Sequence, residues 1–141
     1  MSTGALQEAL RAEHATLYLY GVLGARTSQS ESPALFATLT DCHQHHRGLR
    51  DQLRLMVHDA GAEPVAAEPV YEVPPGWIRP SAITTAARGL EAAAAESMAA
   101  LVARTSGEHR RWALAALVWS ATRQLELGGS PETWPGAPEL G

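Results

Sequence analysis

The sequence contains no lysine and no asparagine, and its basic residues are eleven arginines scattered along the chain. The formal net charge is −4, and Arg110–Arg111 is the one adjacent basic pair. A protein that follows a nucleic-acid backbone needs clustered positive charge. We therefore predict no nucleic-acid partner.

Long apolar runs and paired cysteines are also missing. No run approaches the roughly 20 apolar residues that span a bilayer, so we expect no membrane association. The start, MSTGALQEALRAEH, lacks the charged and apolar blocks of a secretory signal. The one cysteine, Cys42, cannot form a disulfide within the chain. These absences predict a cytoplasmic protein.

The sequence does contain a helical hydrophobic pattern in four segments. At 141 residues, the chain is long enough for one domain with one core. Apolar residues recur at three- and four-residue steps over residues 4–26, 33–60, 82–104 and 108–127. The pattern predicts an all-α fold of four helices that fills residues 1–141 as a single domain, with a tail over 128–141.

The connection over residues 61–81 contains five prolines and decides the topology. A helix of this protein is roughly 37 Å long at 25 residues, and a 21-residue extended segment reaches about 70 Å. The crossover can therefore return the chain to the end of the bundle that it left, while the short breaks after helices one and three favour antiparallel hairpins. Two hairpins joined by one long crossover form the ferritin-like four-helix bundle. A disordered linker between separate hairpins is the alternative, and it would bury too little surface.

Several polar side chains fall on the apolar stripes of these helices. Helical wheels place Glu13 and His46 near the middle of their stripes and Glu91 at an edge. Matching heights within each hairpin sets Glu13 level with His46 and Glu91 level with Arg123, and Arg50 lies one turn from His46. Because a buried carboxylate must be paired, we predict an inner polar network of these five residues. In it, Glu13 bonds His46 or Arg50, and Glu91 pairs with Arg123.

Four stretches of the chain resemble one known family: AEHATLYLYGVLGAR, HRGLRDQL, GAEPVAAEPVYEVP and GLEAAAAESMAALVA. They are similar to small bacterial ferritin-like proteins catalogued as a domain of unknown function. The resemblance covers nearly the whole chain, and the crossover is its most specific part. It implies a ferritin-like fold and a dimer, and it implies no reaction.

The same residues also look like part of a carboxylate-bridged di-iron site. Such bundles supply a Glu from each of two helices and Glu-x-x-His from each of the other two. Here His43-x-x-His46 replaces one motif, and WSATRQ, residues 119–124, offers neither carboxylate nor histidine. Two irons need bridging carboxylates, so we expect a degenerate site, no cofactor and no catalysis. A single iron, manganese or zinc ion on Glu13, His43, His46 and Glu91, in a metal-binding or redox protein, is the alternative.

The fourth helix is apolar nearly all round. Leu114, Leu117 and Ala121 form one stripe, and the far side carries Trp112, Ala115 and Trp119. A helix that is apolar on every side is covered on every side, and Trp is enriched at interface anchors. We predict a homodimer through Trp112, Ala115 and Trp119, with cover by Trp77 and the crossover within one chain as the alternative.

These observations predict a non-catalytic structural or partner-binding protein, with no feature that identifies a partner other than a second copy. A further alternative is a binder of a small apolar ligand inside the bundle. Its pocket would be lined by Tyr20, Met56 and Met98.

Overall fold

The protein, described over residues 3–141 by a computed structural model, consists of four long helices and one short turn of 3-10 helix. They are α1 (Thr3–Ala25), α2 (Pro33–Asp59), α3 (Pro80–Arg104), α4 (Gly107–Glu126) and η1 (Pro138–Leu140). The described residues contain no strand, in agreement with the predicted all-α class and four-helix bundle. The long helices begin and end within two residues of the expected bounds. None of the helices in this range has the length and hydropathy to cross a membrane.

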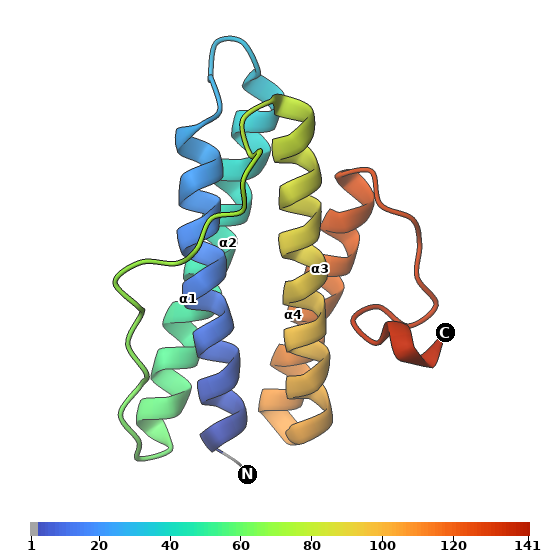
Figure 1. Ribbon diagram of the computed structural model, residues 1–141. Helices are drawn as coiled ribbons and strands as arrows, with labels where there is room; N and C mark the ends of the chain where they lie inside the picture. The colour runs from blue at the N-terminus through green and yellow to red at the C-terminus, as the bar shows by residue number, and fades with distance from the viewer. Residues whose placement is uncertain (1–2) are drawn as a thin grey trace.

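The helices pack as two pairs, α1 with α2 and α3 with α4, and α1 also packs against α3 (Figure 1). The crossover, residues 60–79, runs along α1 and α2 from one end of the bundle to the other (Figure 1). The tail, residues 127–141, turns back beside α3 and α4 and carries η1 (Figure 1). The crossover therefore covers part of the outer side of α1 and α2, and the tail covers part of the outer side of α3 and α4.

Proline and glycine set several helix ends. Pro33 and Pro80 occupy the first positions of α2 and α3, where the missing N–H is not needed. After α2, Gly61 adopts φ 84°, and the Ala62 N–H donates to the Val57 carbonyl at 3.2 Å. This bond and the positive φ are those of a Schellman cap. The chain can therefore leave the helix sharply and enter the crossover.

The core is divided into two apolar clusters with a polar layer between them. One cluster contains Leu6, Leu10, Leu53, Met98 and Leu101, and the other contains Tyr20, Leu23, Leu39, Cys42 and Ile83. Along each of α1, α2 and α3, one charged or titratable residue that is at most 1% exposed stands between members of the two clusters. Those three residues form the site described below.

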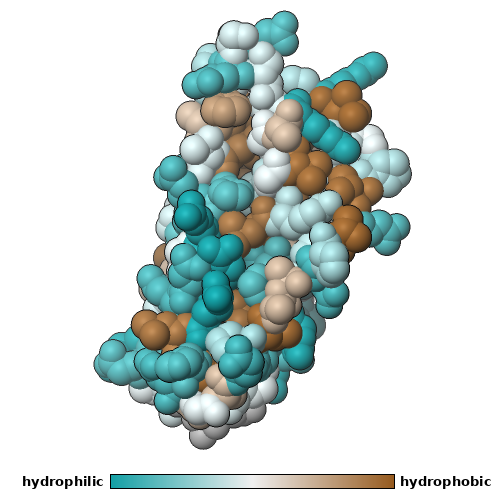
Figure 2. Space-filling view, turned by 90° about the vertical axis from the view of Figure 1, so that its left-hand side faces the viewer, coloured by the Kyte–Doolittle hydropathy of each residue, from teal (hydrophilic) through white to brown (hydrophobic). Residues whose placement is uncertain are grey.

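Four hydrogen bonds hold the crossover to α1 and to Arg26, the residue that follows it. Near its start, Gln7 Nε2 donates to the Glu63 carbonyl at 2.7 Å and Gln7 Oε1 accepts from the Val65 N–H at 2.9 Å. His14 Nε2 lies 3.0 Å from the Val65 carbonyl, and at the far end an Arg26 Nη donates to the Trp77 carbonyl at 3.1 Å. The crossover is therefore a fixed part of the surface. The side of the molecule shown in Figure 2 mixes hydrophilic and hydrophobic residues.

Candidate functional site

Glu13, His46 and Glu91 form a hydrogen-bonded cluster in the middle of the bundle. Nδ1 of His46 lies 2.7 Å from Oε2 of Glu13, and Nε2 lies 2.8 Å from Oε2 of Glu91. All three side chains are at most 1% exposed. One imidazole from α2 thus connects a carboxylate on α1 with a carboxylate on α3. We call these three residues the Glu–His–Glu cluster.

Tyr20 completes the cluster on one side. Its hydroxyl donates to Oε2 of Glu91, the same oxygen that faces His46. The Tyr20 ring also stacks on the His46 ring, with centroids 5.5 Å apart and planes 20° apart. The sequence placed Tyr20 inside the bundle, in a possible ligand pocket, but did not assign it to the polar network. Its position two turns beyond Glu13 was the available signal.

Members of the cluster remain charged although they are buried. Burial disfavours the His46 cation, but hydrogen bonds to both carboxylates outweigh it and raise the His46 pKa to about 10. At Glu91 burial is likewise outweighed, by the hydrogen bond and the charge of His46 and by the hydrogen bond from Tyr20, so that its pKa is lowered. Burial dominates at Glu13 and raises its pKa despite the His46 contact. At neutral pH the cluster therefore contains an imidazolium and a Glu91 carboxylate, with Glu13 the readier of the two acids to take a proton.

The geometry gives the cluster little capacity for a metal ion. His46 directs one ring nitrogen at each carboxylate, so the imidazole itself occupies the space between Glu13 and Glu91. Within residues 3–141, no group of three or more His, Cys, Asp and Glu side chains is arranged to hold an ion. The predicted fourth ligand, His43, lies outside the cluster and lines a surface groove instead.

Two members of the predicted network lie elsewhere. Arg50 was expected beside Glu13, but its Nε and Nη atoms pair with Asp51 on the surface at 2.9 and 2.7 Å. Arg123 was expected to pair with Glu91, but it pairs with Asp41 and, at 3.0 Å, with Glu126. The placement of these two arginines in the network is wrong, whereas Glu13 bonds His46, the other partner expected for it. A long guanidinium side chain reaches exposed carboxylates without entering the core. His46 pairs with the buried carboxylates of Glu13 and Glu91 in place of these arginines.

Within the chain, α2 partly covers both tryptophans that were predicted to form a dimer interface. Trp112 Nε1 donates to the Gln52 side-chain oxygen. Trp119 stacks on His45 with centroids 3.5 Å apart, and the Arg123 guanidinium lies 4.8 Å from its ring centre. Ala115 stays exposed between them. This cover comes from Gln52 and His45 of α2.

The stripe expected to face the core from α4 points outward in part. The core side of α4 instead consists of small or polar residues, Ala113, Ala116, Ser120 and Gln124. Leu114 and Val118 are 49% and 56% exposed. Small residues let α4 pack closely on α3 and leave its larger apolar side chains on the outside.

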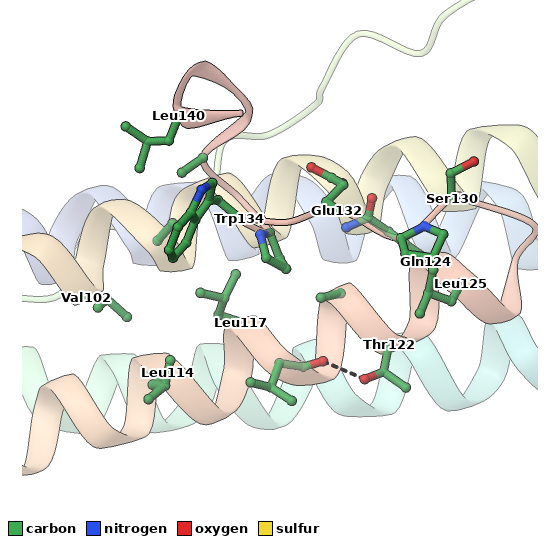
Figure 3. Close-up of a pocket in the computed structure, with 16 residues that line it drawn as sticks. Val102, Leu114, Leu117, Thr122, Gln124, Leu125, Ser130, Glu132, Trp134 and Leu140 are labelled. Carbon is green, nitrogen blue, oxygen red and sulfur yellow. Dashed lines mark hydrogen bonds between the residues drawn. The ribbon is translucent and has the colours of Figure 1, made fainter.

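Those side chains line a groove of about 500 Å³ between α3, α4 and the tail, which we call the apolar groove. Figure 3 shows Leu114, Leu117 and Leu125 of α4 and Trp134 of the tail around it. Of the eight large hydrophobic side chains exposed in the described residues, five line this one groove: Leu114, Val118, Leu125, Trp134 and Leu140. Such a concentration marks a contact or binding surface.

The pocket expected inside the bundle is filled by side chains. Tyr20 and Met98 are fully buried, each in one of the two core clusters, and Met56 packs against the cluster that contains Met98. The apolar groove on the outside of α4 is therefore the better candidate for an apolar ligand.

Comparison with known proteins gives a family and a fold. No curated protein matches the chain. Among solved structures, the crystal structure of the conserved hypothetical protein rv2844 from Mycobacterium tuberculosis is similar, with 27% sequence identity and a TM-score of 0.80. The match covers 88% of this chain and 92% of that one. The family described as "Domain of unknown function (DUF4439)" matches residues 5–139, so the chain belongs to this family.

Proposed function

We propose that this protein is a ferritin-like bundle without catalytic metal that acts as a partner-binding homodimer, with a second copy on the apolar groove. The observation that carries the proposal is the concentration of exposed apolar side chains around that groove. We also propose a cytoplasmic location, from the absence of paired cysteines.

The ferritin-like assignment is supported by the order of the helices. Two helix pairs are joined by a crossover that runs the length of the bundle (Figure 1). In metal-loaded proteins of this topology, carboxylates and histidines point to the bundle centre. Here the Glu–His–Glu cluster lies at the centre, and its imidazole pairs with one oxygen of each carboxylate. We infer that this cluster is a degenerate di-iron site in which a protein cation has replaced the metal ions.

The choice of a second copy rests on the chemistry and continuity of the surface. Glu132 is the one charged residue that lines the apolar groove, and interface centres are poor in charge. Val118 and Thr122 line both this groove and a neighbouring hollow formed with Ala115 and Trp119. The groove is thus continuous with part of the surface predicted from the sequence, and a two-fold contact would bury the same patch on both copies.

The oligomeric state tests this proposal. Light scattering after size-exclusion chromatography should give 2 × 15.0 = 30.0 kDa for the wild type at micromolar concentration. V118E should give a monomer, because it places a charge in the contact. L55E is the matched control, since Leu55 on α2 is 60% exposed and lies outside the groove. A monomeric wild type, or a V118E protein that remains as dimeric as L55E, would overturn the dimer.

Metal content tests the second part of the proposal, that the bundle holds no catalytic metal. Protein purified without a tag and incubated with Fe²⁺, Mn²⁺ or Zn²⁺ should retain less than about a tenth of an equivalent after desalting, because His46 holds the space between the carboxylates. Near-stoichiometric retention that is lost in E91Q but kept in E96Q would establish the metal-binding alternative. Glu96 is an exposed residue of α3 and makes a matched control.

A small apolar ligand is the second candidate, and the groove volume favours it. About 500 Å³ lies within the range of small-molecule sites, roughly 300–1,000 Å³. Native mass spectrometry separates it from the dimer, since a co-purified ligand adds mass to a monomer and a second copy doubles it.

A further inference from the structure

A second groove, on the opposite pair of helices, is polar and basic. It has a volume of about 400 Å³ and lies between α1, α2 and the crossover. Its lining is quite unlike that of the apolar groove: two histidines, two arginines and two tyrosines surround it, with Glu68 as its one acidic residue. Nothing in the proposed function uses it. We call it the polar groove.

The basic side chains of the polar groove come from one face of α2. His43, Arg47 and Arg50 follow one another at steps of four and three residues, so they lie on the same side of the helix. Arg50 pairs with Asp51, but the Arg47 guanidinium makes no hydrogen bond or ion pair to another residue within 3–141. Burial lowers the His43 pKa, and the charges of Arg47, Arg50 and His46 lower it further. The wall of the groove is therefore electropositive.

The opposite wall is fixed and offers donors. The Tyr18 and Tyr71 rings pack together with centroids 5.3 Å apart, which joins α1 to the crossover. The Tyr71 hydroxyl accepts from the Glu68 N–H at 2.9 Å, so its own proton is free for another acceptor. The bonds from Gln7 and His14 to Val65 hold the crossover in place next to this wall. The groove is thus formed before any ligand arrives, which lowers the entropic cost of binding.

We propose that the polar groove binds a small organic anion through its phosphate or carboxylate group. Arg47 forms the ion pair with the anion, and His43 and the Tyr71 hydroxyl are within the same lining to donate further hydrogen bonds. Arginine matches the planar arrangement of oxygens in both kinds of anion. Leu17 and the tyrosine rings contact the body of the ligand. Glu68, at the edge, opposes the anion and limits its affinity.

The binding experiment uses phenyl phosphate and benzoate as probes and phenol as the uncharged control. Each is titrated into full-length protein in phosphate-free buffer of low ionic strength, and histidine ring signals are followed by NMR. At least one of the two anions should bind saturably and shift the His43 signal, whereas phenol should not. The anion with the lower dissociation constant identifies the head group as phosphate or carboxylate. If neither anion binds more tightly than phenol, the proposal is overturned.

Matched variants test the residues. R47Q should weaken binding about tenfold or more, because it removes a charge-assisted contact. R54Q should bind like the wild type, since Arg54 is an exposed arginine of the same helix that does not line the groove. E68Q should tighten binding by about twofold as an opposing charge disappears. Equal losses in R47Q and R54Q would show non-specific charge attraction and would overturn the site, whatever the oligomeric state.

A pH titration of the His43 signal gives a readout that is independent of affinity. The titratable or charged groups around His43 are His14 and Tyr18 on α1, His46, Arg47 and Arg50 on α2, and Glu68 and Tyr71 on the crossover. A bound anion offsets the positive ones, so the His43 pKa should rise on saturation. An unchanged pKa at saturation would place the anion outside the groove and would contradict the proposal.

Discussion

Replacing His46 with leucine should destabilise the protein in a way that depends on pH. The imidazole lies between Glu13 and Glu91 at 2.7 and 2.8 Å and is fully buried. H46L keeps a similar volume but leaves two carboxyl groups in the core without a cation. Removing one partner of a buried charge pair is far more costly than replacing the whole set.

The magnitude follows from the pKa of His46. Its folded-state pKa is raised to about 10 from an unfolded value near 6.5. At roughly 1.4 kcal/mol per pKa unit, the cluster contributes about 3–5 kcal/mol. Because the folded pKa is the higher one, this contribution is complete below pH 6.5 and is lost as the pH rises toward 10. Glu13, whose pKa is also raised, and Glu91, whose pKa is lowered, change the pH dependence of stability in opposite directions. The His46 contribution itself is expected to disappear between pH 6.5 and 10.

Urea unfolding followed by tryptophan fluorescence measures the effect. Between wild type and H46L, the difference in unfolding free energy should be about 3–5 kcal/mol at pH 6.5 and should shrink to about 1 kcal/mol at pH 10. Titration of Cys42 is common to both proteins and cancels. H58Q is the control, because the His58 side chain is 76% exposed. A difference in unfolding free energy that does not change between pH 6.5 and 10 would refute the argument. E13Q offers a milder test, in which the loss of stability with rising pH should begin at lower pH than in the wild type.

Two more predictions concern single residues. Cys42 is fully buried, and burial raises the pKa of its thiol to about 11. Native protein at pH 8 should therefore react with a disulfide reagent at least about 100-fold more slowly than urea-unfolded protein. Equal rates would show an accessible thiolate. Gly136 has φ 77°, and an added Cβ would lie 2.3 Å from the Ala95 carbonyl oxygen. G136A should therefore release the tail to proteolysis while the unfolding free energy of the bundle changes by less than about 1 kcal/mol, and an unchanged cleavage rate would contradict the close contact.

The contact between Glu13 and His46 was within reach of sequence reasoning. Both residues lie in the middle of an apolar stripe, and a short loop between α1 and α2 fixes their relative height. Local periodicity and loop length are sufficient for that step. The bond between His46 and Glu91 was not accessible in the same way, because it joins α2 to α3 across the crossover. Only the packing of the two helix pairs determines which side chains meet there.

The two arginines show a different limit. A helical wheel gives the direction of a Cβ atom, but the guanidinium of Arg123 lies several bonds away and chooses among all carboxylates within reach. Asp41 and Glu126 are exposed, with 57% and 56% of their side chains accessible, so pairing there avoids desolvation of the cation. A long cationic side chain therefore pairs with the carboxylate at the surface, where the desolvation cost is lower than at the buried carboxylate.

The face of α4 could not be predicted for a third reason. Alanine, leucine and tryptophan occur on every side of this helix, so its periodicity carries little directional information. The tight packing of α4 then selects alanine and serine for the inside, and Leu114, which belongs to the predicted stripe, is exposed. This arrangement produces the apolar groove on a side of α4 that the sequence did not single out.

The Glu–His–Glu cluster also bears on how the fold selects one arrangement of its helices. The apolar clusters on either side consist largely of leucine and alanine, and such surfaces can slide past one another by a turn at modest cost. The cluster cannot, because a one-turn shift of α3 relative to α2 would move Glu91 about 5.4 Å from the imidazole and leave charged groups unpaired in the core. A buried polar set whose charges are paired in only one register excludes the other registers even where its net contribution to stability is small. The polar layer therefore has a structural reason to persist in this chain without any catalytic metal.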